Sequence, residues 1–175
     1  MSYLDEQSDL KHRRHTMINL FLRHLWVMLV LGNTLGIALQ WWWANRRLRQ
    51  DPKAQARVAA MAKRSLIVTC IPWVVMGIGA TVGGIPSFFE FLRPRVGNIY
   101  VLAFYASIVA VWALTSWWLV FRDGATQVVA CKGFFSFDFS SPLQIYLLLA
   151  ISTVWMCMMM VILFLVDVPT PQDGP

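Results

Sequence analysis

Four long apolar runs, separated by short polar segments, dominate the chain. They cover about residues 20–43, 66–89, 99–121 and 143–166. A helix of about 24 residues is about 36 Å long at about 1.5 Å per residue, and this length crosses a hydrocarbon layer of about 30 Å. Because every backbone N–H and C=O group must find a partner inside lipid, such runs fold as helices. The pattern predicts an all-α integral membrane protein: a bundle of four transmembrane helices that forms a single membrane domain over residues 1–175.

The first run has the flanks of a helix that stays in the membrane. It is longer than the apolar core of a secretory signal, which has roughly 7–15 residues. It ends in Trp41–Trp43, an aromatic interface anchor, and Arg46 and Arg47 follow closely. We therefore expect the run to remain attached, so that the mature protein keeps four spans. Cleavage near the small residues Gly36 and Ala38 is the alternative.

The segment between the first two runs, residues 44–65, is a basic amphipathic linker. Asp51 followed by Pro52 is typical of a helix start, because aspartate caps free N–H groups and proline suits the first helical position. Residues 53–64 are rich in alanine and contain no glycine or proline. The second helix is therefore predicted to begin near Pro52, in water, and to run directly into the membrane.

Two short elements outside the spans are predicted to lie on the bilayer surface. Residues 87–93 contain three phenylalanines and are followed by Pro94, which suggests a short helix that stops there. Residues 135–140 alternate between phenylalanine and a polar residue, which suggests an extended segment with its phenyl rings on one side. Ser141 and Pro142 are then expected to cap the fourth helix.

Composition supports the membrane assignment and narrows the function. Hydrophobic residues make up 58% of the chain and charged residues 14%, with a mean hydropathy of +0.57. An average soluble domain is about 45–50% apolar and about 25% charged. The sequence contains no Gly-x-Ser-x-Gly motif, no phosphate-binding loop and no zinc-binding cysteine spacing. We therefore expect no catalytic site and no cofactor, and we do not expect an enzyme.

The net charge of +6 arises from cations that lie beside the apolar runs. This placement favours anionic lipid over nucleic acid as a partner, because nucleic acid binds a basic face on a folded soluble surface. Each Lys or Arg near an anionic leaflet contributes about 1 kcal/mol to membrane attraction. The predicted lipid-contact residues all belong to the linker: Arg46, Arg47, Arg49, Lys53, Arg57, Lys63 and Arg64.

The same cations predict an orientation. With four spans, the linker and the third loop share one side and hold nine Lys and Arg residues, whereas the side with both tails holds six. The positive-inside rule places the more basic side in the cytoplasm. The linker is therefore predicted to be cytoplasmic, and both termini are predicted to lie outside.

Two glycine pairs predict close helix packing. Gly32 and Gly36 lie one turn apart in the first run, and Gly79 and Gly83 lie one turn apart in the second. Small residues at this spacing let two helix backbones approach closely. We expect contacts between helices of the same chain, and the alternative is a contact with another copy of the chain.

The second run also contains Pro72 and Pro86. Each is predicted to kink the helix, because proline lacks the N–H donor. Broken helices expose backbone groups that can line a substrate or ion site, which suggests a small oligomeric channel or carrier built around this helix. No Asp, Glu or Lys lies in the middle of any run, which argues against a pump with a buried carboxylate.

Met156 and Met160 lie one turn apart in the fourth run, and thioether sulfur suits Cu(I). This spacing resembles that of eukaryotic copper-uptake channels over five residues, but the methionine-rich outer segment of that family is absent and the number of spans differs. A copper or redox membrane protein is therefore a third hypothesis. The isolation of the pair predicts that both methionines pack in the membrane and bind no metal.

The leading hypothesis rests on four spans, short loops and no charged site in the middle of the membrane. This combination is typical of a small accessory or scaffold subunit of a membrane complex. Its expected partners are the lipid bilayer and either other membrane subunits or further copies of itself. The channel or carrier is the alternative, and the copper or redox protein comes third.

Overall fold

Four long helices carry the structure. The computed structural model describes residues 24–131, 134 and 139–166, and within these ranges it contains helices and no strand. The elements are α2 (Leu25–Arg47), α3 (Pro52–Thr81), the 3-10 helices η1 (Phe88–Leu92) and η2 (Pro94–Val96), α4 (Ile99–Phe121), α5 (Gly124–Ala130) and α6 (Pro142–Leu165). Helices α2, α3, α4 and α6 are long and apolar enough to cross a membrane. The predicted four-helix membrane bundle is confirmed, and the chain is a multi-pass integral membrane protein.

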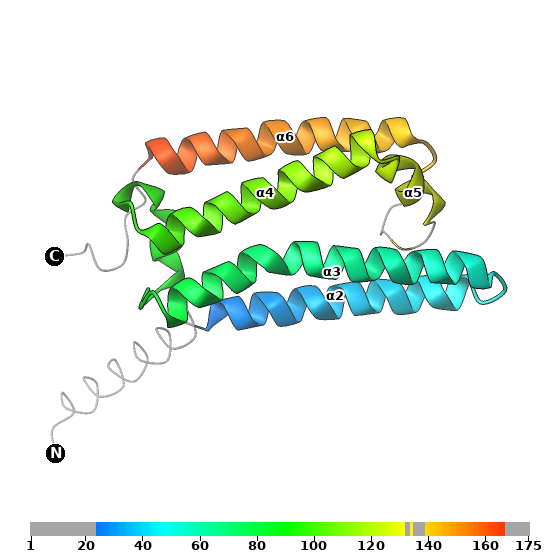
Figure 1. Cartoon of the computed structure of the whole chain (residues 1–175), viewed down its shortest axis with the longest axis horizontal. Coiled ribbons are helices and arrows are strands. Elements are labelled where there is room, and N and C mark those ends of the chain that lie inside the picture. The colour runs from blue at the N-terminus through cyan, green and yellow to red at the C-terminus, as the bar shows by residue number, and fades with distance from the viewer. Residues whose placement is uncertain (1–23, 132–133, 135–138, 167–175) are drawn as a thin grey trace, which may run out of the picture.

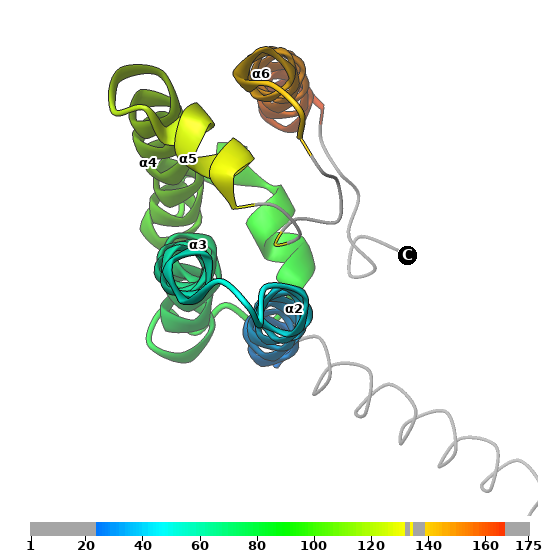
Figure 2. The same cartoon turned by 90° about the vertical axis from the view of Figure 1, so that its right-hand side faces the viewer.

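The long helices run back and forth across the bundle (Figure 1). Seen end on, α2, α3, α4 and α6 follow one another around an open curve, with α2 and α6 at its two ends (Figure 2). Helix α2 runs beside α3, and α4 approaches α3 most closely near the end of α3 and diverges from it toward α5 (Figure 1), whereas α6 makes few close approaches to any other helix. The bundle is therefore tight on one side and loosely closed on the other.

The two ends of the bundle differ (Figure 1). We call the end with the α2–α3 turn and α5 the linker end; it comprises residues 44–65 and 118–131 and the start of α6. The opposite end, which we call the terminal end, comprises residues 76–105, the start of α2 and the end of α6. Both described chain ends, at residues 24 and 166, therefore lie at the terminal end, as four antiparallel spans require.

Buried side chains gather in two separate clusters, one at each end. The linker-end cluster consists of Ala44, Val58, Met61, Ala62, Leu119, Ala125, Val128, Cys131, Phe134 and Ile145. The terminal-end cluster consists of Met76, Ile85, Phe91, Val101, Phe104 and Tyr105. No residue of α4 from Ala106 to Trp118 is buried. The described side chains thus fill the bundle at its two ends and pack more loosely at mid-height.

Helix α3 begins where the sequence predicts. Asp51 occupies the N-cap, and its Oδ1 atom accepts a hydrogen bond of 3.0 Å from the Ala54 N–H group. Pro52 takes the first helical position, and the helix then continues for 30 residues with Pro72 in its interior. Such a helix is about 45 Å long, which exceeds the thickness of the hydrocarbon layer. Its first turns therefore project beyond the membrane.

The end of α3 lies earlier than predicted. Hydropathy predicts a span that reaches residue 89, but the helix ends at Thr81. Gly84 adopts a left-handed φ of 65°, and the Ile85 N–H group donates at 3.2 Å to a carbonyl oxygen in the last turn of α3. The chain therefore folds back over the helix end. Pro86 lies beyond the helix, so the predicted kink at this residue is wrong.

The predicted surface elements are more buried than expected. Within the predicted segment 87–93, Phe88–Leu92 form η1, but Phe91 is only 1% exposed and belongs to the terminal-end cluster. The Tyr105 hydroxyl donates a hydrogen bond of 2.8 Å to the Phe91 carbonyl oxygen, which ties η1 to α4. Of the second predicted element, residues 135–138 lie outside the described residues, and Phe139 packs partly buried against the linker-end cluster.

Helix α5 is an element that the apolar pattern does not predict. Asp123 precedes it with a left-handed φ of 52°, which turns the chain sharply after α4. Ala125 and Val128 are buried in the linker-end cluster, so the seven-residue helix closes this end between α4 and α6. Helix α6 then starts at Pro142 behind Ser141, as predicted, although the Ser141 side chain makes no capping hydrogen bond.

Candidate functional site

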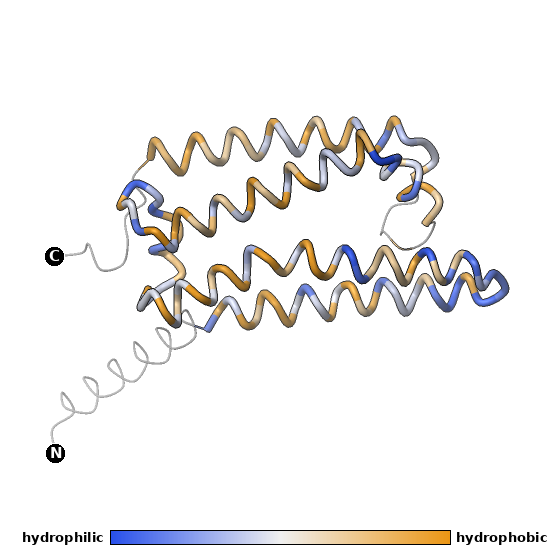
Figure 3. The backbone as a smooth tube through the Cα atoms, in the orientation of Figure 1, coloured by the Kyte–Doolittle hydropathy of each residue, from blue (hydrophilic) through white to orange (hydrophobic). Residues whose placement is uncertain are grey.

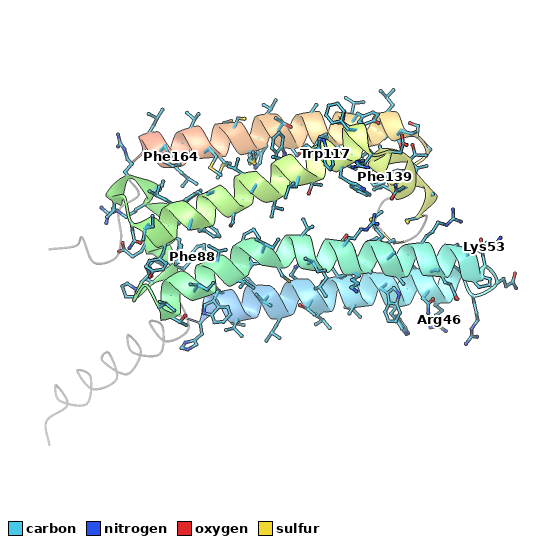
Figure 4. All side chains as sticks on the ribbon, in the orientation of Figure 1. Arg46, Lys53, Phe88, Trp117, Phe139 and Phe164 are labelled. Carbon is cyan, nitrogen blue, oxygen red and sulfur yellow. The ribbon has the colours of Figure 1, made fainter. Side chains whose placement is uncertain are left out.

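Hydrophilic residues gather around the α2–α3 turn at the linker end of the bundle (Figure 3), and many of them are cations. The seven residues predicted to contact lipid lie in α2, in the following turn or in the first part of α3, and all are exposed. Arg46 and Lys53 lie close to the α2–α3 turn (Figure 4), and Arg122, directly after α4, adds an eighth exposed cation. Asp51 and Asp123 are the acids among the described residues of this end. The linker end therefore carries a strongly positive field.

One face of α3 turns part of this charge toward the inside of the bundle. Arg57, Met61, Arg64 and Val68 are spaced by three or four residues, so they form a single stripe along the helix. Met61 is buried in the linker-end cluster, whereas Arg57 and Arg64 are exposed above and below it. The stripe forms one wall of a groove that the end of α4 and α5 line from the other side.

The opposite wall is built around two tryptophans at the end of α4. The Arg122 guanidinium lies 5.1 Å from the centre of the Trp117 ring; such cation–π contacts are worth about 0.5–1 kcal/mol at exposed sites. A Cβ atom at Gly124 would lie 2.7 Å from the Trp118 carbonyl oxygen, so this glycine is needed for the tight turn into α5. The Gln127 side chain donates to the Arg122 carbonyl oxygen at 3.3 Å. These contacts fix the corner between α4 and α5.

The groove between these walls, which we call the basic groove, consists of two adjoining hollows. The outer hollow has a volume of about 420 Å³. Its lining combines polar residues (Arg57, Arg64, Asp123, Thr126 and Gln127) with Ala60, Met61, Ala130 and Cys131. The inner hollow has a volume of about 520 Å³ and reaches further along the spans. Its lining includes the apolar residues Met61, Val68, Leu114, Trp117 and Trp118, together with Arg64, Ser65, Thr115, Arg122 and Gln127.

Cys131 contributes a thiol to the lining of the basic groove. Burial raises the pKa of the Cys131 thiol, and the nearby charge of Arg57 offsets part of this rise. The thiol is therefore protonated at neutral pH, and a protonated thiol is a poor nucleophile. Across residues 24–131, 134 and 139–166, no three His, Cys, Asp or Glu side chains lie close enough together to hold a metal ion.

The second glycine pair lies at a tight helix contact. A Cβ atom at Gly79 would be 2.9 Å from the Phe91 ring, and one at Gly83 would be 2.5 Å from the Tyr100 ring. The structure therefore brings both glycines against η1 and the first turn of α4. Gly83 lies just beyond the end of α3, so the contact involves the helix end rather than two continuous helices.

The first glycine pair does not pack within the chain, contrary to the expectation. A Cβ atom at Gly32 or Gly36 would meet no atom within 4 Å. The reason is that α2 meets the rest of the bundle through a different face, which includes Trp26, Asn33 and Ile37. Each glycine precedes one of these positions by one residue, which rotates it by about 100° around the helix. The pair is left on an open face of α2.

Helices α2 and α3 also share a polar contact inside the membrane-spanning region. The Asn33 side-chain N–H donates to the Thr69 hydroxyl at 2.7 Å and lies 3.4 Å from the Cys70 sulfur. The Thr69 hydroxyl in turn donates to the Ser65 carbonyl oxygen at 2.6 Å. Sequence reasoning did not pair these residues; the signal available was only that Asn33 is polar in an apolar run.

The methionine pair of α6 has surroundings that suit packing. Met160 is partly buried and packs against the terminal-end cluster, as Leu163 does one turn further on. Met156 is also partly buried, whereas the neighbouring Cys157 is exposed. The two thioethers therefore occupy the side of α6 that faces the bundle at its terminal end.

The basic groove unites predicted and unpredicted residues. Arg57 and Arg64 were expected to contact lipid. The sequence alone does not show that Arg122 and the tryptophans of α4 lie opposite them, because this depends on how α4 is placed against α3. The other predicted cations lie outside the groove lining. No family model, no curated protein and no solved structure matches the chain.

Proposed function

We propose that this protein is a small accessory or scaffold subunit of a larger membrane complex. The observation that supports the proposal is that α6 is held to the bundle near its two ends and lies open between them. Its most apolar 18-residue window has a mean hydropathy of 2.5, and none of that window is buried. Since lipid tails are as apolar as leucine, exposure alone is tolerated in a bilayer; the informative feature is how α6 is attached to the rest of the bundle.

Helix α6 is held mainly at its two ends. At the linker end, Ile145 is buried in the cluster. At the terminal end, the centres of the Phe164 and Tyr105 rings lie 5.9 Å apart. The Arg95 side chain also donates a hydrogen bond of 3.2 Å to the Leu165 carbonyl oxygen. Residues 147–159 include no buried residue. The middle of this span is therefore available for a helix from another subunit.

Helix α2 supplies a second open face at the other end of the curve (Figure 2). Gly32 is exposed, Gly36 is partly exposed, and both have free space above their Cα atoms. A glycine face lets a foreign helix approach closely and gain dispersion contacts along its length. Open faces at both ends of the curve suit a protein that joins neighbouring subunits.

The alternative, a small channel or carrier, has one supporting observation. A cavity of about 110 Å³ lies beside the Gly83–Pro86 segment and is lined in part by Glu90, Arg93 and Asn98. This volume holds only a few waters, at about 30 Å³ each. Helix α3 itself is continuous as far as Thr81. Its interior backbone groups are therefore paired within the helix, apart from the carbonyl group one turn before Pro72, which loses its N–H donor.

Purification of the full-length protein in mild detergent tests the proposal. We expect a foreign membrane protein to co-purify in stoichiometric amount, and we expect Gly36→Leu to remove it. The matched control is Ala38→Leu, which adds the same side chain to an exposed position on the opposite side of α2. A pure homo-oligomer would contradict the proposal and favour the channel or carrier, and a monomer without partners would contradict both.

We also propose that the linker end faces the cytoplasm, so that both termini lie outside. The support is the excess of cations at this end, which the positive-inside rule associates with the cytoplasm. A single cysteine at Gln50, in a background without native cysteines, should react with an impermeant reagent only after the cells are permeabilised. A cysteine at Val96, which is 64% exposed at the terminal end, should react in intact cells. The reverse pattern would mean that the orientation is inverted.

A further inference from the structure

The basic groove has the composition of a lipid headgroup site. We propose that it binds one anionic glycerophospholipid, with the phosphate between Arg64 and Arg122 and an acyl chain along the inner hollow. This goes beyond a general attraction between cations and an anionic leaflet, because it assigns one molecule to one place. It is independent of the proposed role as a subunit.

The charges of the groove complement an anionic headgroup. Arg57, Arg64 and Arg122 line it, and Asp123 is the acid among its lining residues. A guanidinium presents paired N–H donors that match two oxygens of a phosphate group. A zwitterionic choline lipid would bring its own cation toward the three arginines, so the lining favours a headgroup with a net negative charge.

The arginines lie at the depth of lipid headgroups. Arg64 is the last charged residue of α3 before the uncharged stretch 65–81, and Arg122 directly follows the α4 span. Tryptophan collects at the same level of a bilayer, and Trp117 stacks on the Arg122 guanidinium at 5.1 Å. The stacking orients Arg122 before any ligand binds, which reduces the entropy lost on binding.

The inner hollow continues the site into the hydrocarbon layer. Val68 lies about 6 Å along α3 from Arg64, and Leu114 lies about 12 Å along α4 from Arg122, at about 1.5 Å per residue. The hollow measures about 520 Å³, within the range of about 300–1,000 Å³ that is typical of ligand sites. It lies beside the stretch of α4 that has no buried residue. An acyl chain there would supply the dispersion contacts that the side chains of this region do not make.

The decisive feature is that three arginines and an extended apolar lining occur together in one groove. Inorganic phosphate would use the arginines and leave the inner hollow unused, whereas a neutral lipid would use the inner hollow and leave three arginines without a partner. A lipid with an anionic headgroup is the ligand that uses both hollows at once.

Native mass spectrometry of the full-length protein, released from detergent micelles, tests the proposal. The probes are phosphatidylglycerol and phosphatidylcholine with the same acyl chains. We expect one phosphatidylglycerol to bind at a concentration at least tenfold below that needed for phosphatidylcholine. The Arg64→Gln/Arg122→Gln variant should lose this preference, with a fall of about 25-fold if each cation contributes about fivefold.

The control removes equal charge outside the groove. Arg46→Gln/Arg49→Gln alters two exposed cations that line neither hollow. We expect this variant to keep the single bound phosphatidylglycerol, and we expect Arg64→Lys/Arg122→Lys, which keeps the charge and the fold, to bind with intermediate affinity. An equal loss in both glutamine variants would overturn the proposal, because the attraction would then be spread over the surface.

The acyl chain has its own test. Val68→Trp fills the inner hollow and leaves every charge in place. We expect this variant to weaken phosphatidylglycerol binding at least fivefold and to leave α-helical content, measured by circular dichroism, unchanged. Binding of phosphatidylglycerol that is unaffected by Val68→Trp, or that inorganic phosphate displaces at equal concentration, would overturn the assignment of a lipid to the groove. The same conclusion would follow if the parent protein bound both lipids equally.

Discussion

Replacement of Gly83 by alanine perturbs the point where the end of α3 meets α4. The new Cβ atom would lie 2.5 Å from the Tyr100 ring and 2.6 Å from the Gly79 carbonyl oxygen. Ordinary contacts of a Cβ atom begin at about 3.4 Å, and distances below 3.0 Å are essentially never observed. The Tyr100 ring can rotate, but the Gly79 oxygen belongs to the backbone. The helix end must therefore shift.

The expected cost follows from overpacking in well-packed cores, which is typically about 1–3 kcal/mol. In a chain of about 150–250 residues, each kcal/mol lowers the unfolding temperature by about 2–4 °C. We expect Gly83→Ala to lower the unfolding temperature by about 2–12 °C. Thermal unfolding in mild detergent, followed by tryptophan fluorescence, measures this change.

Gly36→Ala is the matched control for this prediction. A Cβ atom at Gly36 meets no atom within 4 Å, and alanine is favoured over glycine inside a helix by about 1 kcal/mol. This variant should therefore unfold at the parent temperature or slightly above it. If Gly83→Ala also left the unfolding temperature unchanged, α4 would not lie against the end of α3, and the packing described for the terminal end would be refuted.

Three further changes test other contacts by the same assay. Asp51→Ala removes the N-cap of α3 and should lower the free energy of unfolding by about 0.5–2 kcal/mol. Asp51→Ser keeps a capping oxygen and should retain most of this stability. Asn33→Val removes the hydrogen bond to Thr69 and should lower the free energy of unfolding by about 0.6 kcal/mol, the average for such bonds in membranes. A loss above about 2 kcal/mol would contradict this expectation, because it would exceed the contribution of an ordinary hydrogen bond between membrane helices. Burial raises the pKa of the Cys131 thiol above its ordinary value of 9.0. Above this pH, the folded protein therefore keeps a proton on the thiol that the unfolded chain has lost. Stability from this group should decline above about pH 9, and the parent should lose stability more steeply there than Cys131→Ala; parallel pH curves for the two proteins would contradict this.

Hydropathy predicts the spans well because it reports the one property that the bilayer selects. The start of α3 is equally predictable, because Asp51 and Pro52 act through local backbone chemistry. The end of α3 is not, because Gly83, Gly84 and Ile85 are as apolar as the helix before them. The left-handed φ of Gly84 breaks the helix without changing the hydropathy.

The two glycine pairs show that spacing alone does not decide which pair packs against a neighbour. Both pairs have the same spacing, yet only Gly79 and Gly83 meet a neighbour. Which pair packs depends on the rotation of α2 around its own axis, and this rotation is set by larger side chains such as Trp26, whose ring lies against Gly77. The spacing of glycines on one helix does not show whether they face a neighbouring helix.

The basic groove could not be predicted from the sequence either, because its residues come together only in the folded chain. Arg64 and Arg122 are far apart in the sequence and line the same hollow because α3 and α4 place them on facing sides of it, where α5 adds Gln127. A helix of seven residues gives too short a pattern to be predicted from its apolar positions. The sequence could identify the side on which the cations lie, but not which of them converge.

If the exposed middle of α6 contacts another membrane subunit, photo-crosslinking in intact membranes will capture that subunit. A photoreactive amino acid at Val154, which is 70% exposed, should form one discrete adduct with a foreign membrane protein. The same probe at Ile145, which is buried within the chain, should form none. Adducts at Val154 with lipid alone, or with a second copy of this chain alone, would contradict the account.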